Sequence, residues 1–240
     1  MNNVNKLLET KIELSDKKIH VFLLELDLFN GDNLYVYLPE DEAKRAARLK
    51  IEEKKNQFVI SRGILRLLLS NCLQKKPEKI NFLYGQHCKP AIEDKYNNKS
   101  VEFNVSHSGG YALIAITLDN KVGVDIEKIN HEIDYQSLSD RFFSGKENDE
   151  LRSLDENEKL DAFYRAWVRK ESFIKATGKG ITFGLDSFSV SLAESRKSSI
   201  EVISENLINE QWYCYDLNNL DDYKLALTSC SKEQELIIFR

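Results

Sequence analysis

Two acidic residues stand in a segment that is otherwise typical of a protein core. Residues 122–127 read Val-Gly-Val-Asp-Ile-Glu, a pattern that predicts a strand. Side chains alternate between the two faces of a strand, so Asp125 and Glu127 share one face and the apolar residues fill the other. Two neighbouring carboxylates repel each other unless a cation lies near both. The pair is therefore a candidate cation site.

A predicted helix supplies a third acid. Phe163, Trp167 and Ile174 are spaced as one apolar stripe of a helix, and Glu171, four residues after Trp167, falls beside that stripe. Carboxylate oxygens are the ligands that a hard cation such as Mg2+ prefers. If this helix meets the strand, the three carboxylates become candidate ligands of one ion.

Each acid also has an ordinary structural explanation. Asp125 and Glu127 fit the wet face of an edge strand, and Glu171 fits an ion pair with Lys175 on the same helix. Together with a basic loop and a glycine-rich turn, an Mg2+ site explains the pattern better. Mg2+ in proteins is typically held by a few carboxylates and by phosphate groups of a substrate. We therefore expect a substrate with a pyrophosphate.

A serine-rich turn precedes the acidic strand. Residues 106–110 read Ser-His-Ser-Gly-Gly, which predicts the end of a strand and a tight turn. Hydroxyl groups, a histidine and exposed amides at such a turn suit a phosphate group, and a plain hairpin turn is the alternative. No G-x-S-x-G pattern surrounds the serines, and no acid is placed to complete a catalytic triad. Hydrolase chemistry is therefore disfavoured.

Several basic residues are candidate phosphate contacts. Lys170 and Lys175 flank the helix acid, with ordinary solvation as the alternative. Pro39, followed by three acids, predicts the start of a helix that becomes basic at Lys44 and Arg45. Basic residues on a helix are more often a solvated face than a binding site.

Composition limits the class of protein. The chain has 240 residues, of which 42% are hydrophobic, and this favours a packed globular core. Its formal net charge of -5 argues against bulk binding of nucleic acid. No apolar run approaches the ~20 residues of a membrane span, and residues 1–10 lack the apolar core of a signal peptide. We expect a cytoplasmic monomer with no nucleic-acid or membrane partner.

The order of predicted elements indicates an α/β (α+β) fold made of two similar halves. Residues 111–115, Tyr-Ala-Leu-Ile-Ala, are echoed weakly by residues 223–227, Tyr-Lys-Leu-Ala-Leu. This echo suggests an N-terminal half at residues 1–120 and a C-terminal half at residues 121–240. Ligands usually bind in clefts, so we expect the active site in a cleft between the halves.

Four motifs, in order along the chain, resemble the signature of the Sfp-type 4′-phosphopantetheinyl transferases. The motifs are Phe-Asn-Val-Ser-His-Ser at residues 103–108, Val-Gly-Val-Asp-Ile-Glu-Lys at residues 122–128, Arg-Phe-Phe-Ser at residues 141–144 with Glu147, and Trp167 followed by Lys-Glu-Ser-Phe-Ile-Lys at residues 170–175. The similarity covers the chain from about Pro39 to Phe188 and continues more loosely to residue 223. It implies two α/β halves related by a pseudo-twofold axis.

The resemblance implies a reaction and a metal site. The phosphopantetheine arm of coenzyme A would pass to a serine of an apo carrier protein (a peptidyl, acyl or aryl carrier domain), with release of 3′,5′-ADP. Mg2+ is the implied cofactor and coenzyme A the co-substrate. The implied metal ligands are Asp125, Glu127 and Glu171. We expect Glu171 to accept the serine proton, with Glu147 as the competing base.

The resemblance also implies contacts with coenzyme A. Lys175 matches a lysine that contacts the pyrophosphate, and Ser106 and His107 match a pair near the 3′-phosphate. Lys89 and Pro90 match the Lys-Pro of the preceding loop, on the phosphate or adenine side. We add three basic residues to these expected contacts, Lys44, Arg45 and Lys170.

One position departs from the family pattern, in which an Arg that contacts coenzyme A is common near the place of Gln57. Lys55, Arg62 and the basic cluster at residues 44–48 are the candidates for its replacement.

The sequence leaves two other functions open. One is a coenzyme A or carrier-protein binding module that has lost catalysis, and the other is a metal-dependent phosphohydrolase.

Overall fold

The chain folds into two compact units. The computed structural model describes residues 4, 7, 9–85, 89–93, 97, 100–180, 183–202, 210–217, 220–231 and 234–240. The first unit comprises Met1–Glu102, Gly110–Asp119 and Glu235–Arg240, and the second comprises Phe103–Gly109 and Asn120–Gln234. Compared with the expected division after residue 120, residues 103–109 group with the second unit and residues 235–240 with the first. Helices and sheets are mixed in both units, which confirms the α/β class, whereas the two-half symmetry stays a prediction.

The first unit is built on a sheet of strand order β12-β1-β5-β4. Strand β1 (Lys18–Glu25) runs parallel to β12 (Glu235–Phe239) and antiparallel to β5 (Tyr111–Leu118), and its six inner residues are buried. Strand β4 (Val101–Ser108) begins in this unit and continues into the second. A continuous apolar run is what a central strand with two covered faces requires.

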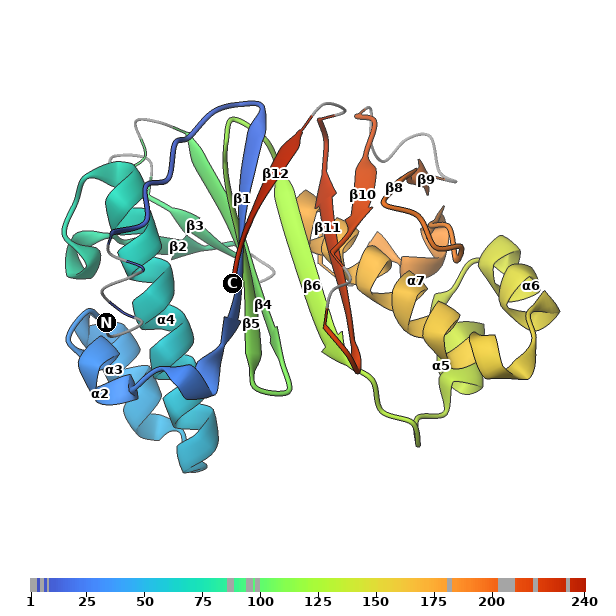
Figure 1. Ribbon diagram of the computed structural model, residues 1–240, viewed down its shortest axis with the longest axis horizontal. Helices are drawn as coiled ribbons and strands as arrows, with labels where there is room; N and C mark the ends of the chain where they lie inside the picture. The colour runs from blue at the N-terminus through green and yellow to red at the C-terminus, as the bar shows by residue number, and fades with distance from the viewer. Residues whose placement is uncertain are drawn as a thin grey trace. The chain divides into compact units, whose positions relative to one another are not determined.

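Helices complete the first unit, with a short two-stranded ribbon (Figure 1). The 22-residue helix α4 contacts both α2 and α3. Pro39 is the N-cap of α3, and three acids follow in the first turn, as predicted for a helix start. The elements are α2 (Gly31–Tyr35), α3 (Glu40–Arg48), α4 (Glu52–Leu73), β2 (Phe82–Tyr84) and β3 (Pro90–Ile92), with 3-10 turns at Leu26–Leu28 and Pro77–Lys79.

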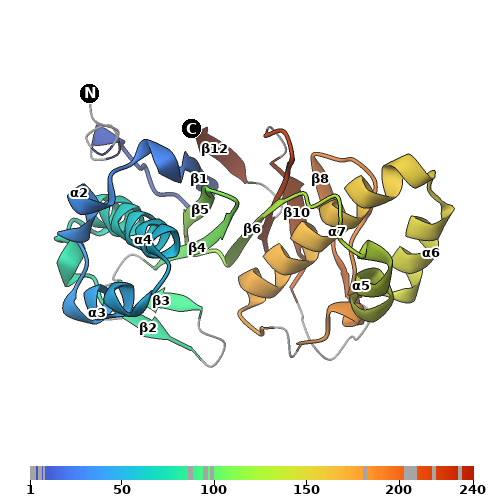
Figure 2. The same ribbon diagram turned by 90° about the horizontal axis from the view of Figure 1, so that it is seen from below.

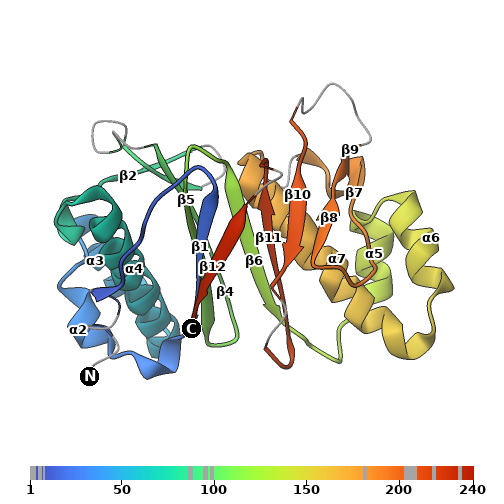
Figure 3. The ribbon, with the colours of Figure 1, turned by 45° about the horizontal axis from the view of Figure 1, so that its top comes forward.

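The second unit pairs an antiparallel sheet with one long helix. The sheet has the order β6-β11-β10-β8 (Figure 3). Helix α7 contacts β6, β11 and β10, while α5 and α6 lie beside α7 (Figure 2). The elements are β6 (Val122–Lys128), α5 (Tyr135–Phe142), α6 (Gly145–Ser153), α7 (Glu156–Thr177), a 3-10 turn (Leu185–Ser187), β7 (Phe188–Ser189), β8 (Lys197–Ser199), β9 (Glu201–Val202), β10 (Tyr213–Asp216) and β11 (Tyr223–Ser229).

Gly123 allows α7 to lie directly against β6. A Cβ atom added at this residue would lie 2.0 Å from the carbonyl oxygen of Ser172 and 2.3 Å from the backbone nitrogen of Ala176, both on α7. The hydroxyl groups of Ser172 and Thr228 meet at 2.7 Å and tie the same stretch of α7 to β11. Because the backbone of α7 lies so close to Gly123, a larger residue at this position would push α7 away from the strand.

Among the described residues, no helix is both long and apolar enough to cross a bilayer.

Gly123→Ala should lower the free energy of unfolding by about 3 kcal/mol, because the new methyl group meets backbone atoms that have no rotamer to change. Gly145→Ala is the matched control, since a Cβ at that residue meets nothing within 4 Å. Urea denaturation of both variants measures the difference. Equal stability of the two variants would show that α7 does not depend on this contact.

Candidate functional site

Strand β6 and helix α7 bring an acid and a lysine into contact. Asp125 is 1% exposed, and the Nζ atom of Lys175 lies 2.6 Å from its Oδ1 atom. Ser106, on β4, donates a hydrogen bond to the same Oδ1 atom at 2.9 Å and accepts one from Lys175 Nζ, also at 2.9 Å. The three side chains form a closed hydrogen-bonded triangle within the second unit.

The two glutamates lie within electrostatic reach of this triangle. Burial raises the pKa of Asp125 above its usual value, against the opposing effects of the Lys175 ammonium and of the Ser106 hydroxyl. Burial also raises the pKa of Glu127 and that of Glu171, and in both cases the charge of Asp125 raises the pKa further. The ammonium of Lys175 acts in the opposite direction on both glutamates. The charges of the three acids therefore interact: Asp125 raises the pKa of both glutamates, and Glu171 also raises the pKa of Glu127.

The donor set suits a hard cation. The Oδ2 atom of Asp125 is buried and has no hydrogen-bond partner among the described residues, and a buried acceptor without a partner is costly. A divalent ion would satisfy this oxygen and relieve the repulsion between the acids. As the side chains stand, the described part of the chain holds no group of three His, Cys, Asp or Glu residues that is ready to bind a metal ion. Lys175 supplies the positive charge instead.

Glu147 and Lys170 form an ion pair inside the core of the second unit. Both side chains are 0% exposed, and the Lys170 Nζ atom lies 2.7 Å from Glu147 Oε2. Lys170 also donates to two backbone carbonyls, those of Leu185 and Phe188, at 2.8 Å each. Burial lowers the pKa of Lys170, against the opposing effect of the Glu147 charge. This lysine is a core residue and does not face solvent.

Both carboxylate oxygens of Glu147 already accept backbone hydrogen bonds. Oε2 accepts from the N–H of Ser144 at 2.7 Å, as half of a capping box at the start of α6, and Oε1 accepts from the N–H of Val190 at 2.8 Å. A base must reach the proton that it removes, and neither oxygen is open to a substrate. The placement argues against Glu147 as the competing base and against Lys170 as a coenzyme A contact.

Strand alternation separates the two residues of the expected Ser106–His107 pair. Ser106 is buried against Asp125, whereas His107 is exposed. Ser108 lies on the same face as Ser106, and its Oγ atom donates to Glu127 Oε2 at 3.0 Å. Sequence reasoning missed this last contact. The same alternation that pairs Asp125 with Glu127 was the available signal for it.

The expected coenzyme A contacts of the first unit lie on α3 and on the two-stranded ribbon. Lys44 is exposed and pairs with Glu40 at 2.6 Å, while the guanidinium of Arg45 lies 5.1 Å from the ring centre of Phe58. Lys89 is half-buried, and Pro90 opens β3 opposite Tyr84. All four residues belong to the first unit, and each of them is at least partly exposed to solvent.

Arg62, one of the candidates to replace the family arginine near Gln57, is packed against aromatic rings. Its guanidinium lies within 6.0 Å of the ring centres of three aromatic residues, and its Nε atom lies 3.9 Å from Glu42 Oε1. The three rings belong to Phe58, Phe82 and Tyr84. Lys55 instead pairs with Glu52 at 3.1 Å.

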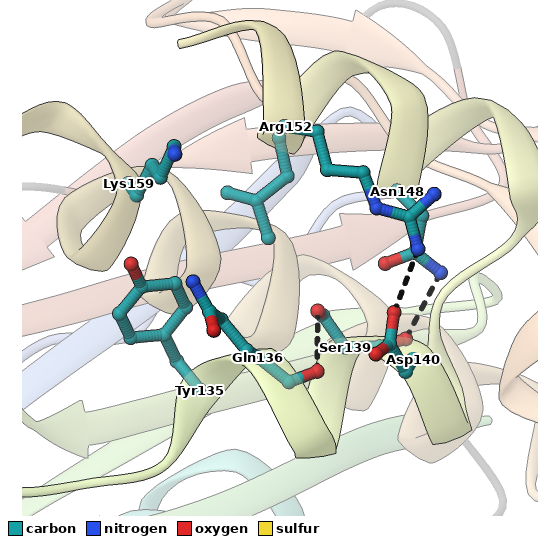
Figure 4. Close-up of a pocket in the computed structure, with 8 residues that line it drawn as sticks. Tyr135, Gln136, Ser139, Asp140, Asn148, Arg152 and Lys159 are labelled. Carbon is teal, nitrogen blue, oxygen red and sulfur yellow. Dashed lines mark hydrogen bonds and ion pairs between the residues drawn. The ribbon is translucent and has the colours of Figure 1, made fainter. Parts of the chain in front are cut away.

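A separate cavity of about 210 Å³ lies between α5, α6 and α7 (Figure 4). Its polar groups are largely satisfied by one another: Arg152 pairs with Asp140 at 2.8 Å, and the amide of Asn148 donates to the carbonyl of Ser139 at 3.1 Å. Lys159, at the edge of the cavity, pairs with Glu156 at 2.9 Å. None of the predicted site residues lines this cavity.

Comparison with known proteins adds a second line of argument. Residues 121–228, which contain all three acids and Lys175, match the model of the 4′-phosphopantetheinyl transferase superfamily, and residues 32–119 match that of the N-terminal part of a 4′-phosphopantetheinyl transferase. The chain is 34% identical to the 4′-phosphopantetheinyl transferase HetI of a Nostoc species over 190 residues, which are 78% of this chain and 79% of the relative. This chain belongs to the 4′-phosphopantetheinyl transferase superfamily.

Two further relatives are similar to the chain over most of its length. The chain is 34% identical to the 4′-phosphopantetheinyl transferase Sfp of Bacillus subtilis over 190 residues, 77% of this chain and 81% of the relative. It is 27% identical to the human L-aminoadipate-semialdehyde dehydrogenase-phosphopantetheinyl transferase over 212 residues, 79% of this chain and 69% of the relative. Membership confirms the family and the enzyme class predicted from the four motifs.

Glu147→Gln should lower the free energy of unfolding by about 3 to 5 kcal/mol, because Lys170 would keep a buried charge without its partner. Asp149→Asn is the control on the same helix: its side chain is 82% exposed, and its pairing with Arg152 spans 3.6 Å. The control should change stability by less than about 0.5 kcal/mol. Full stability of Glu147→Gln together with complete loss of phosphopantetheinyl transfer would instead make Glu147 a catalytic residue.

Proposed function

We propose that this chain transfers the 4′-phosphopantetheine arm of coenzyme A to a serine hydroxyl of an apo carrier protein, namely a peptidyl, acyl or aryl carrier domain. The serine oxygen forms a bond to the phosphorus next to the pantetheine arm, the bond to the bridging pyrophosphate oxygen breaks, and 3′,5′-ADP leaves. One observation carries the proposal. Asp125, Glu127, Glu171 and Lys175 interact electrostatically within one unit, with Lys175 in direct contact with Asp125, and all four lie in the range that matches the superfamily model.

Asp125, Glu127 and Glu171 would hold Mg2+ in this reaction. The buried Oδ2 atom of Asp125, which has no partner among the described residues, and the raised pKa values of the two glutamates beside it support this choice. When bound, the ion supplies positive charge to the pyrophosphate oxygens. Lys175 would bind a pyrophosphate oxygen with the ammonium that now lies on Asp125.

Glu171 would accept the proton of the carrier serine. Burial and the charge of Asp125 raise the pKa of Glu171. A metal ion bound at the three acids would lower this pKa again, so the choice of Glu171 as the base rests on its position among the metal ligands and not on its pKa. Glu171 is half-buried on α7, one turn before Lys175. A single helix would thus place the base next to the group that binds the pyrophosphate.

The coenzyme A nucleotide would be bound by the basic residues named from the sequence. Lys44, Arg45, Lys89 and Pro90 of the first unit, with His107, are our candidates for the 3′-phosphate and adenine side. Ser106 belongs to this set only if its hydroxyl exchanges its present partners for the ligand. A cytoplasmic location and a monomeric state stay expectations from the sequence. Nothing among the relatives supports a catalytically inactive binding module.

Incubation with coenzyme A, Mg2+ and apo carrier protein should increase the mass of the carrier by one phosphopantetheine arm. Asp125→Asn and Glu171→Gln should lower the rate by at least about 100-fold, because each removes a charge that acts at the reacting phosphorus. Glu158→Gln, an exposed acid near the other end of α7, serves as the control. An unchanged carrier mass across peptidyl, acyl and aryl carriers, with intact coenzyme A, would contradict the proposal.

A further inference from the structure

Three polar side chains of β4 contact β6 in the second unit. Asn104 Oδ1 accepts a hydrogen bond from the backbone N–H of Val124 at 2.9 Å. Two residues further on, Ser106 donates to Asp125, and after two more residues Ser108 donates to Glu127. The spacing of two residues places all three side chains on one face of β4. Each acid of β6 thus has its own hydroxyl donor.

The hydroxyl group of Ser108 is oriented by the backbone. Its oxygen accepts a hydrogen bond from the N–H of Lys128 at 3.1 Å. A hydroxyl group has one proton to donate, and in Ser108 this proton is directed to Glu127 Oε2 at 3.0 Å. Lys128 directly follows Glu127 on β6, so the hydroxyl bridges the backbone of the strand and the carboxylate beside it. The bridge fixes the carboxylate relative to its own strand.

Glu127 needs such a constraint more than Asp125 does. Asp125 is 1% exposed and is held by both Lys175 and Ser106. Glu127 is half-buried, has a longer side chain, and has like charges on Asp125 and Glu171 nearby. Repulsion and rotational freedom both favour movement of this carboxylate away from the other two acids. The hydrogen bond from the Ser108 hydroxyl opposes this movement.

We propose that Ser108 is a positioning residue, whose hydroxyl holds Glu127 in the orientation that binds the divalent ion. This inference rests on the proposed function, because it requires the metal site formed by the three acids. Groups that orient metal ligands typically change metal affinity by about 10- to 100-fold when they are removed. Ser108 would act through Glu127 and not through contact with coenzyme A.

The test is Mn2+ binding, measured from the electron paramagnetic resonance signal of the free ion with coenzyme A at constant concentration. Ser108→Ala should bind Mn2+ about 10-fold more weakly than the wild type, with an unchanged melting temperature. Ser108→Thr restores the hydroxyl and should bind within about threefold of the wild type. Ser153→Ala is the control, because this residue is exposed and its hydroxyl donates to the backbone carbonyl of Glu150, outside the site. Ser108→Cys, a near-isostere with a weak donor, replaces Ser108→Ala if the latter unfolds.

A double-mutant cycle separates positioning from a general structural effect. In a Glu127→Gln background, Ser108→Ala should cause no further loss of Mn2+ affinity, because the carboxylate that it orients is gone. Wild-type affinity in Ser108→Ala, or the same loss in both backgrounds, would overturn the role of Ser108 and leave the transferase proposal standing. If the wild type itself binds no Mn2+, the metal site of the proposed function fails, and the role of Ser108 fails with it.

Discussion

The contact of α7 with β6 at Gly123 brings the acids of β6 close to Glu171 and Lys175 of α7. A side chain at residue 123 would meet the helix backbone, so the absence of one allows α7 to approach the strand. Asp125 lies two residues further along the same face of β6, and Glu171 and Lys175 lie on the facing part of α7. The ion pair of 2.6 Å between Lys175 and Asp125 follows from this approach. One residue without a side chain thus sets the distance between two oppositely charged elements.

The approach of α7 to β6 buries three acids near one another, and the surrounding groups offset only part of the free-energy cost of their charges. Burial raises the pKa values of all three acids, and the charge of Asp125 raises those of Glu127 and Glu171 further. Lys175 and the hydroxyls of β4 compensate part of this cost. The buried Oδ2 atom of Asp125 remains without a partner among the described residues. A divalent ion bound by the acids, together with a phosphate that attracts Lys175, would therefore stabilise this site.

The sequence was informative where a period of two or 3.6 residues was regular. It predicted the strand that carries Asp125 and Glu127, the helix that carries Glu171, and the family. It did not reveal that Glu147 and Lys170 form an ion pair in the core, because a motif does not show which charged residues are paired there. It also assigned no strand to residues 235–239, which form β12 beside β1. That pairing joins residues more than two hundred positions apart, and local patterns carry no information on such a partner.

In the proposed reaction, Asp125, Glu127 and Glu171 bind one divalent ion while Lys175 turns to the phosphate. Crystals of the protein with Mn2+ and coenzyme A, measured at a wavelength where manganese scatters anomalously, would reveal this arrangement. We expect one anomalous peak within bonding distance of all three carboxylates, with the Lys175 ammonium moved from Asp125 to a pyrophosphate oxygen. A peak bound by other residues, or coenzyme A bound with Lys175 still on Asp125 and no ion at the acids, would contradict it.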